Sequence, residues 1–137
     1  MIGDDKVAIV SVKAPAAIGP YSQGIKAGDF IYLSGQIPID PATGQVVPGG
    51  IEEQTHQVLK NISNVLEVTG SGLFQVIKTT VFMKSLADFD KMNAVYKEYF
   101  LVTPPARTTV EISRLPKDVL IEIESVVYSP RKGNASF

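Results

Sequence analysis

Apolar residues recur at helical spacing in two stretches of the chain. Across residues 51–69 they fall on one helical face, and Gly70 follows where a helix is expected to stop. The same spacing predicts a second helix over about 87–100, with a largely aromatic stripe. Pro104-Pro105 then blocks any continuation of that helix. The pattern therefore predicts two amphipathic helices.

Shorter runs of β-branched and apolar residues predict strands around these helices. Two runs flank Gly28-Asp29 and indicate a hairpin, because glycine adopts the backbone angles of a tight turn. Ile77, Val81 and Met83 are expected on one face of their strand. Residues 38–50 contain three prolines and three glycines and are expected to form a loop. The predicted strands are 7–12, 22–27, 30–34, 76–83, 107–113 and 119–128.

This order of elements indicates one α+β domain. A chain of 137 residues is also the usual length of a single domain. If the strands on either side of each helix are parallel neighbours, right-handed crossovers place both helices on one face of the sheet. The other side of the last strand mixes Glu122 and Glu124 with Leu120 and Val126. Because that side is not purely polar, we expect it to be buried against another subunit.

Composition narrows the possible chemistry. Apolar residues make up 45% of the chain and charged residues 20%, as in soluble globular proteins. The absence of cysteine excludes disulfides, thiolate metal sites and a cysteine nucleophile. Thirteen basic and fourteen acidic residues leave a net charge of −1, which gives no overall attraction to nucleic acid or to an anionic membrane. With no signal-like N-terminus and no long apolar run, a cytoplasmic protein is expected.

The familiar catalytic motifs find little support. His56 is the only histidine, and its place on the first predicted helix is expected to face solvent. One histidine without cysteine argues against zinc, and a Ser-His-Asp triad would have to use His56. Gly70-Ser71-Gly72 follows a helix and is expected to be a turn, not a phosphate loop. Arg131-Lys132 is too short for a nucleic-acid footprint.

Three segments combine polar residues with glycine or proline: 19–24, 34–38 and 104–110. Gly35 permits close approach of a ligand to the backbone. Arg107, directly after a rigid turn, suits either a surface ion pair or an anionic ligand. Glu122 and Glu124 share one strand face and suit a solvated edge, basic partners or acid–base chemistry. From spacing alone these alternatives stay open.

Seven motifs are spread along most of the chain: APAAIGPYSQG (14–24), SGQIP (34–38), KTTVF (78–82), NAVY (93–96), PAR (105–107), RLPKD (114–118) and IEIE (121–124). Taken together, they closely resemble the Rid family, the YjgF-type reactive intermediate deaminases, and within it the RidA branch. The similarity extends over about 7–128, in the family's order and spacing.

The resemblance implies a chorismate-mutase-like α+β fold and a homotrimer whose sheets surround a central barrel, with active sites between subunits. The implied reaction is hydrolysis of 2-imino acids, or their enamine tautomers, to 2-oxo acids and ammonia. Such intermediates are released by pyridoxal-phosphate dehydratases, and 2-iminobutanoate and 2-iminopropanoate are the usual substrates. No cofactor and no metal is implied, because a protonated imine is already electrophilic.

The resemblance also implies roles for individual residues. Arg107 is expected to bind the substrate carboxylate through parallel guanidinium donors. Glu122 is expected to position water or accept a proton, with Glu124 as the alternative, and Tyr21 to wall the pocket and bond substrate or water. Further substrate-binding positions are Ser34, Gly35, Asn93 and Thr109.

Two positions depart from many bacterial relatives. Thr109 stands where they have cysteine, which rules out thiol-based regulation at this position. Ser22 stands where an aliphatic residue is common, beside Tyr21. Two other functions remain open: a non-enzymatic trimer that binds a small carboxylate, and, with less support, a translation-inhibiting endoribonuclease. The single domain is expected to span 1–137, with a core over 7–128 and terminal tails at 1–6 and 130–137.

Overall fold

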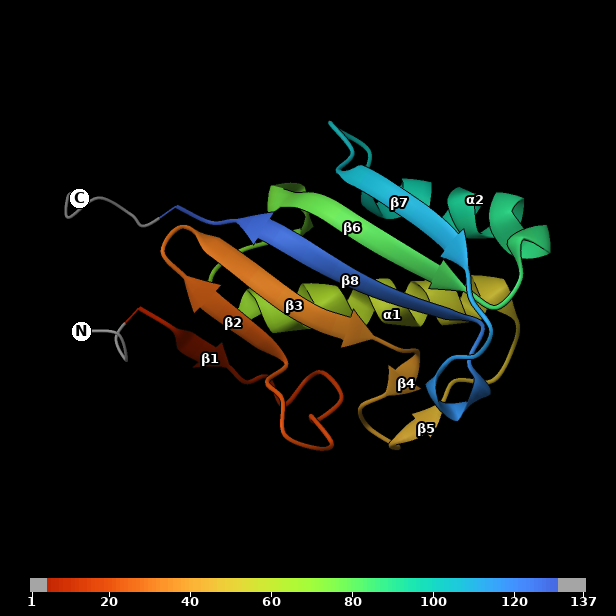
Figure 1. Cartoon of the computed structure of the whole chain (residues 1–137), viewed down its shortest axis with the longest axis horizontal. Coiled ribbons are helices and arrows are strands. Elements are labelled where there is room, and N and C mark those ends of the chain that lie inside the picture. The colour runs from red at the N-terminus through yellow and green to blue at the C-terminus, as the bar shows by residue number, and fades with distance from the viewer. Residues whose placement is uncertain (1–4, 131–137) are drawn as a thin grey trace.

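A six-stranded mixed sheet carries both long helices on one face in a computed structural model that describes residues 5–130 (Figure 1). The strand order is β1-β2-β3-β8-β6-β7. The strands are β1 (Val7–Ile9), β2 (Gly24–Ala27), β3 (Phe30–Gln36), β6 (Val76–Met83), β7 (Ala106–Glu111) and β8 (Ile121–Tyr128). The helices are α1 (Ile51–Glu67) and α2 (Phe89–Tyr99), with short 3-10 turns η2 (Leu73–Gln75), η3 (Leu86–Asp88) and η4 (Pro116–Asp118).

Strand directions explain the placement of the helices. Across the sheet, each pair of neighbours in the order β1-β2-β3-β8-β6 is antiparallel. Strands β6 and β7 are parallel, and α2 lies between them in sequence. A parallel pair needs such a crossover, and α2 packs beside α1 on the same face. The predicted α+β fold with two helices on one face of a mixed sheet is confirmed.

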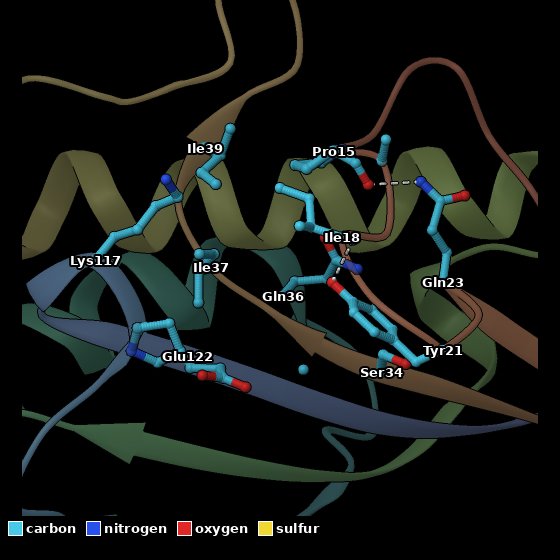
Figure 2. A pocket seen from close by; sticks show the side chains of 13 residues that line it. Pro15, Ile18, Tyr21, Gln23, Ser34, Gln36, Ile37, Ile39, Lys117 and Glu122 are labelled. Atoms are coloured by element: carbon cyan, nitrogen blue, oxygen red, sulfur yellow. Dashed lines mark hydrogen bonds between the residues drawn. The ribbon is translucent and has the colours of Figure 1, made fainter.

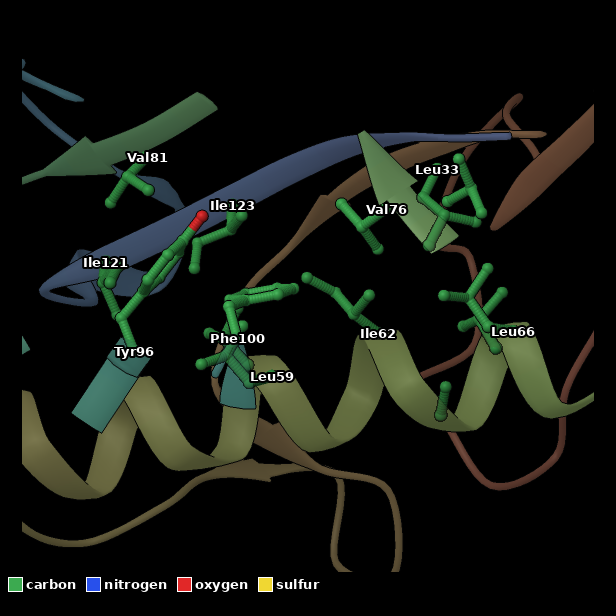
Figure 3. Close-up of a cluster of buried hydrophobic side chains, with 14 of the residues drawn as sticks. Leu33, Leu59, Ile62, Leu66, Val76, Val81, Tyr96, Phe100, Ile121 and Ile123 are labelled. Atoms are coloured by element: carbon green, nitrogen blue, oxygen red, sulfur yellow. The ribbon is translucent and has the colours of Figure 1, made fainter. Parts of the chain in front are cut away.

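Helix α1 supplies much of the hydrophobic core. The Gly50 N–H donates to the Glu53 carboxylate at 2.9 Å at its start. At its end Gly70 has a φ of 75°, and the Ser71 N–H donates to the Leu66 carbonyl at 3.1 Å. Gly70 thus acts as the predicted helix stop. Between these ends, Leu59, Ile62 and Leu66 point toward the sheet (Figure 3). Val58 and Val65 of the same helix are also buried in the core.

The segment 38–50, expected to be a loop, contains a small hairpin of its own. Strands β4 (Ile39–Asp40) and β5 (Gln45–Val46) pair antiparallel. The Gly44 N–H donates to the Asp40 carbonyl at 2.8 Å, and Gly44 has a φ of 74°. The loop prediction was wrong for these four strand residues because the prolines and glycines lie outside the paired positions.

One predicted face of β6 was wrong at its start. Thr79, Val81 and Met83 are fully buried toward the helices, but Ile77 is 44% exposed. A register shift between Val76 and Lys78, against β8, reverses the alternation, so that Val76 takes the core position. A bulge of this kind cannot be predicted from the spacing of apolar residues. The remaining predicted strands are present, with ends that differ by a few residues.

The sheet face without helices is mixed in character, as predicted. On β8, Ile121 and Ile123 are buried beneath α1, whereas Glu122 and Val126 alternate with them. Aromatic side chains of β3, β6 and β8 also lie on this open face and remain partly exposed: Phe30, Tyr32, Phe82 and Tyr128. Burial of this face against another subunit stays a prediction.

Helix length and hydropathy within residues 5–130 give no candidate membrane span, since neither α1 nor α2 is long and apolar enough. The predicted tails at 1–6 and 130–137 lie mostly outside the described residues.

Candidate functional site

Arg107 lies on the edge strand β7, with its side chain on the helix-covered face. Its guanidinium donates from Nη1 to the Asn93 side-chain oxygen at 2.8 Å. Its Cζ lies 4.8 Å from the ring centroid of Tyr96 and 5.5 Å from that of Phe89. We call these four residues the arginine cluster. Its three other members all come from α2.

The arginine has donors to spare. In the part of the chain described, the ion pairs are Lys13–Glu67 and Arg114–Asp118, and neither involves Arg107. A guanidinium carries five N–H donors, of which the Asn93 bond uses one. A hollow of about 330 Å³ opens beside it, lined also by Pro104 and Pro105. The cluster is therefore suited to bind an anion such as a carboxylate.

A second and larger pocket lies at the end of β3. It measures about 510 Å³ and opens between the loop before β2, the end of β3, β8 and η4 (Figure 2). Tyr21, Ser34, Gly35 and Glu122 all line it, and we call it the glutamate pocket. Its other walls are formed largely by apolar side chains, among them Pro15, Ile18, Ile37 and Ile39.

Glu122 is the half-buried carboxyl group of this pocket. Burial, and secondly the charge of Glu124, raise the pKa of Glu122 above its ordinary value. Glu124 itself is exposed and borders a different hollow, with Tyr32, Lys78 and Thr80. Of the two candidate glutamates, Glu122 is the one that the fold places beside Tyr21.

Gly35 makes room for that carboxylate. The pairing of β3 with β8 shifts register between Leu33 and Gln36, so Gly35 lies in a local bulge. A Cβ on Gly35 would overlap Oε2 of Glu122 and come within 2.9 Å of its Cδ. The glycine therefore permits Glu122 to lie against the strand backbone in the wall of the pocket.

Polar contacts hold the pocket's N-terminal loop in place. Ser34 donates its hydroxyl to the Ser22 carbonyl at 2.6 Å, and the Tyr21 hydroxyl accepts from the Ile18 N–H at 3.3 Å. The buried Gln23 amide accepts from the Ser11 N–H at 2.6 Å and donates to the Pro15 carbonyl at 2.7 Å. Ser34 thus supports the wall, while Tyr21, 53% exposed, forms part of it.

Thr109 belongs to neither group. It lines another hollow with Leu86, Ala87, Phe89 and Asp90, and of these only Phe89 also belongs to the arginine cluster. Its Oγ1 is buried and has no hydrogen-bond partner. The structure therefore places Thr109 in a different hollow from the other predicted site residues.

Within one chain the arginine cluster and the glutamate pocket cannot share a small ligand. Arg107 pairs with Thr79, and Thr79 pairs with Ser125 on β8, so these three side chains share the helix-covered face. Glu122 is three positions from Ser125 and therefore faces the open side. Of the predicted site residues, the fold brings together Tyr21, Ser34, Gly35 and Glu122, and separately Asn93 with Arg107.

Some contributors were missed by sequence reasoning. Phe89 and Tyr96 were expected in the apolar stripe of α2, and both do pack in or against the core, but their contacts with Arg107 were not predicted. Their spacing from Asn93, which puts all three on one helix face, is the signal that could have found them. Lys117 lines the glutamate pocket from η4, where its φ of 56° is left-handed. No sequence pattern marks that geometry for lysine.

His56 was expected to face solvent but is half-buried between the helices. Its Nδ1 lies 2.8 Å from the Tyr99 hydroxyl, and the two rings meet edge to face. The pattern of α1 alone does not reveal that α2 covers this position. Residues 5–130 contain no group of three or more histidine and acidic side chains arranged to hold a metal.

The mixed sheet with both helices on one face defines a single-domain α+β protein. A family model described as Endoribonuclease L-PSP matches residues 11–129. The chain belongs to this family, the YjgF or Rid family.

Individual relatives agree with this assignment. A RutC family protein of Pyrococcus horikoshii is 58% identical over 123 residues, which cover 90% of this chain and 98% of the relative. A 2-iminobutanoate/2-iminopropanoate deaminase of Mus musculus is 44% identical over 118 residues, covering 86% of this chain and 87% of the relative. The crystal structure of Escherichia coli TdcF with bound serine has a TM-score of 0.85 at 40% identity and covers 89% and 98% of the two chains.

Proposed function

We propose that this protein is a hydrolase of carbon–nitrogen bonds that converts 2-iminobutanoate and 2-iminopropanoate to 2-oxo acids and ammonia. The observation that carries the proposal is Arg107, a half-buried guanidinium that has an amide and two rings as partners but no carboxylate among the described residues. The mouse relative's deaminase name supports the same reaction.

In this proposal Arg107 binds the substrate carboxylate and Glu122 prepares the water. The raised pKa of Glu122 makes its carboxylate a better proton acceptor than an ordinary glutamate. Tyr21 walls the pocket and bonds substrate or water, and Gly35 lets the ligand approach the strand backbone. Asn93 holds Arg107 from the side.

The reaction balances with one water and with Glu122 as the proton shuttle. Water adds to C2 of the protonated imine while Glu122 accepts a proton from it, which leaves a carbinolamine. Glu122 returns this proton to the nitrogen, and the C–N bond breaks with its electron pair leaving on ammonia. The hydroxyl proton then passes through Glu122 to this ammonia as the carbonyl forms. The products are a 2-oxo acid and ammonium, so orientation and one placed water suffice.

We further propose that the complete site forms between subunits of a homotrimer with a central barrel. Arg107 and Glu122 face opposite sides of the sheet in one chain, so they can meet across a ligand only when two copies contribute. Exposed apolar residues include Ile18, which lines the glutamate pocket, and Leu101 and Val102, which shortly precede Pro104 and Pro105 of the hollow beside Arg107. The proposal treats 1–137 as one domain with its core over 7–128, acting in the cytoplasm.

The test generates 2-iminobutanoate in situ with a threonine dehydratase and follows release of 2-oxobutanoate and ammonia. The wild-type protein should accelerate release above the spontaneous rate. Arg107→Ala should lose at least about tenfold in kcat/KM, since a charge-assisted bidentate contact is removed. Lys60→Ala, an exposed cation on α1, is the matched control and should retain full activity. Full activity in Arg107→Ala contradicts the proposed carboxylate contact.

A second candidate is a binding protein without turnover, favoured by the relative solved with bound serine. It uses the same arginine, so loss of binding in Arg107→Ala does not separate the two functions. Turnover does: a protein that binds 2-oxobutanoate but leaves the spontaneous rate unchanged is a sensor. The description Endoribonuclease L-PSP names a third activity, for which RNA cleavage must copurify with the protein and vanish with Arg107→Ala.

A further inference from the structure

One face of α2 meets the Arg107 guanidinium with three different contacts. Phe89, Asn93 and Tyr96 stand at positions i, i+4 and i+7 of the helix, so they project from the same side. Asn93 accepts a hydrogen bond, and both rings lie within the range at which a cation is attracted to an aromatic face. Tyr96 is the nearer of the two rings.

The Tyr96 side chain is itself fixed by buried contacts with Thr79 and Phe100. Its hydroxyl lies 2.7 Å from Oγ1 of Thr79, which is fully buried in the middle of β6. Tyr96 is 6% exposed and packs against Phe100, with ring centroids 4.6 Å apart. Figure 3 shows the tyrosine directed from α2 toward the sheet. A ring held at both ends cannot turn away from the arginine without breaking a buried hydrogen bond.

A guanidinium that is held by one amide alone could still rotate. Two rings under the same group restrict its plane, and its free donors then keep one direction. We propose that Tyr96, anchored by Thr79, is a positioning residue that sets the orientation of Arg107 for a ligand carboxylate. The ligand class rests on the proposed function, but the orientation of Arg107 does not.

The direct readout needs no ligand. The order parameter of the Arg107 Nε–Hε group, measured by ¹⁵N NMR on the intact protein, should fall in Tyr96→Leu. Thr79→Val and Tyr96→Phe keep the ring and remove only its anchor, so each should give a smaller fall, and the double variant should be no worse than either. An unchanged order parameter in Tyr96→Leu overturns the proposal. If Tyr96→Leu does not fold, an unchanged Arg107 order parameter in Thr79→Val overturns the proposal instead.

The second readout is affinity for 2-oxobutanoate by calorimetry. Tyr96→Leu should raise Kd about tenfold, and Tyr96→Phe about threefold, because most of the ring contact is kept. In an Arg107→Ala background the Tyr96→Leu effect should disappear, whereas a merely structural tyrosine would act equally in both. Tyr99→Leu is the matched control on the same helix: its hydroxyl contacts His56 and not Arg107. It should lower stability and leave Kd unchanged.

These readouts separate the two proposals. A wild-type protein without turnover contradicts the deaminase function, while a fall in the Arg107 order parameter still supports the positioning role. If the wild-type protein turns over normally but the Arg107 order parameter is the same in Tyr96→Leu, the deaminase function is supported and the positioning role is overturned. If 2-oxobutanoate does not bind, the order parameter decides alone.

Discussion

The carboxylate of Glu122 occupies the space that a side chain at position 35 would need. We predict that Gly35→Ala displaces Glu122 from the β3 backbone, because the added methyl group overlaps Oε2. Turnover should fall at least about tenfold, since catalytic groups act only within a narrow range of positions. The coupled assay measures this directly.

Gly50→Ala is the matched control, because a Cβ at Gly50 has open space and the residue has no positive φ. It should keep activity and lose about 1 kcal/mol of stability, because alanine is a poorer N-cap residue than glycine. A fully active Gly35→Ala would mean that the position of Glu122 against the strand is unimportant.

The environment of Glu122 also predicts a pH dependence. Since its carboxylate form accepts the proton, the catalysed rate should fall as pH drops through its pKa, and this acid limb should lie above the ordinary value of 4.5. Removal of the neighbouring charge by Glu124→Gln should move the limb to lower pH. An acid limb that stays in place shows that Glu124 does not influence the reacting group.

The raised pKa of Glu122 also predicts how stability depends on pH. A carboxyl group with a raised folded-state pKa stabilises the fold below its unfolded pKa, and this contribution is lost as pH rises through the folded value. Glu122→Gln should therefore be more stable than wild type at pH 7, and the difference should vanish in acid. Urea unfolding at the two pH values checks this. Equal stability at both contradicts an unfavourable Glu122 charge.

At the scale of elements, the loop before β2 depends on one buried amide. Gln23 is 4% exposed and bonds the backbone of Ser11 and Pro15. Gln23→Leu should cost about 2–3 kcal/mol in unfolding free energy, because buried backbone groups lose their partners. Gln45→Leu, on exposed β5, should change it by less than about 0.5 kcal/mol. Chemical denaturation compares them, and equal costs would show that the Gln23 bonds are dispensable.

Elements with a regular period were predictable, and irregular ones were not. The apolar stripe of α1 and its stop at Gly70 follow from sequence because helix geometry repeats. The bulge at Gly35 and the shift at Ile77 depend on pairing with β8, a strand far along the chain. The β4–β5 hairpin was hidden because its strands are only two residues long.

For the molecule as a whole, motifs predicted site residues but not their separation. Arg107 and Glu122 were assigned to one cleft, and a resemblance to known proteins supplied that grouping. Spacing along the chain cannot show that these two side chains leave opposite faces of the sheet, because this depends on the register of β7 with β6 and of β6 with β8. The structure gives the separation, and this separation is the argument for the proposed site between copies.

The central claim is that each active site takes Arg107 from one subunit and Glu122 from another. The most direct measurement mixes two inactive variants, Arg107→Ala and Glu122→Gln, which are unfolded together and refolded at equal concentrations. In a closed ring of three, each mixed trimer regains one intact site, so about a quarter of the wild-type activity should return. Native mass spectrometry confirms that mixed trimers have formed. Mixed trimers no more active than the separate variants would contradict the shared site.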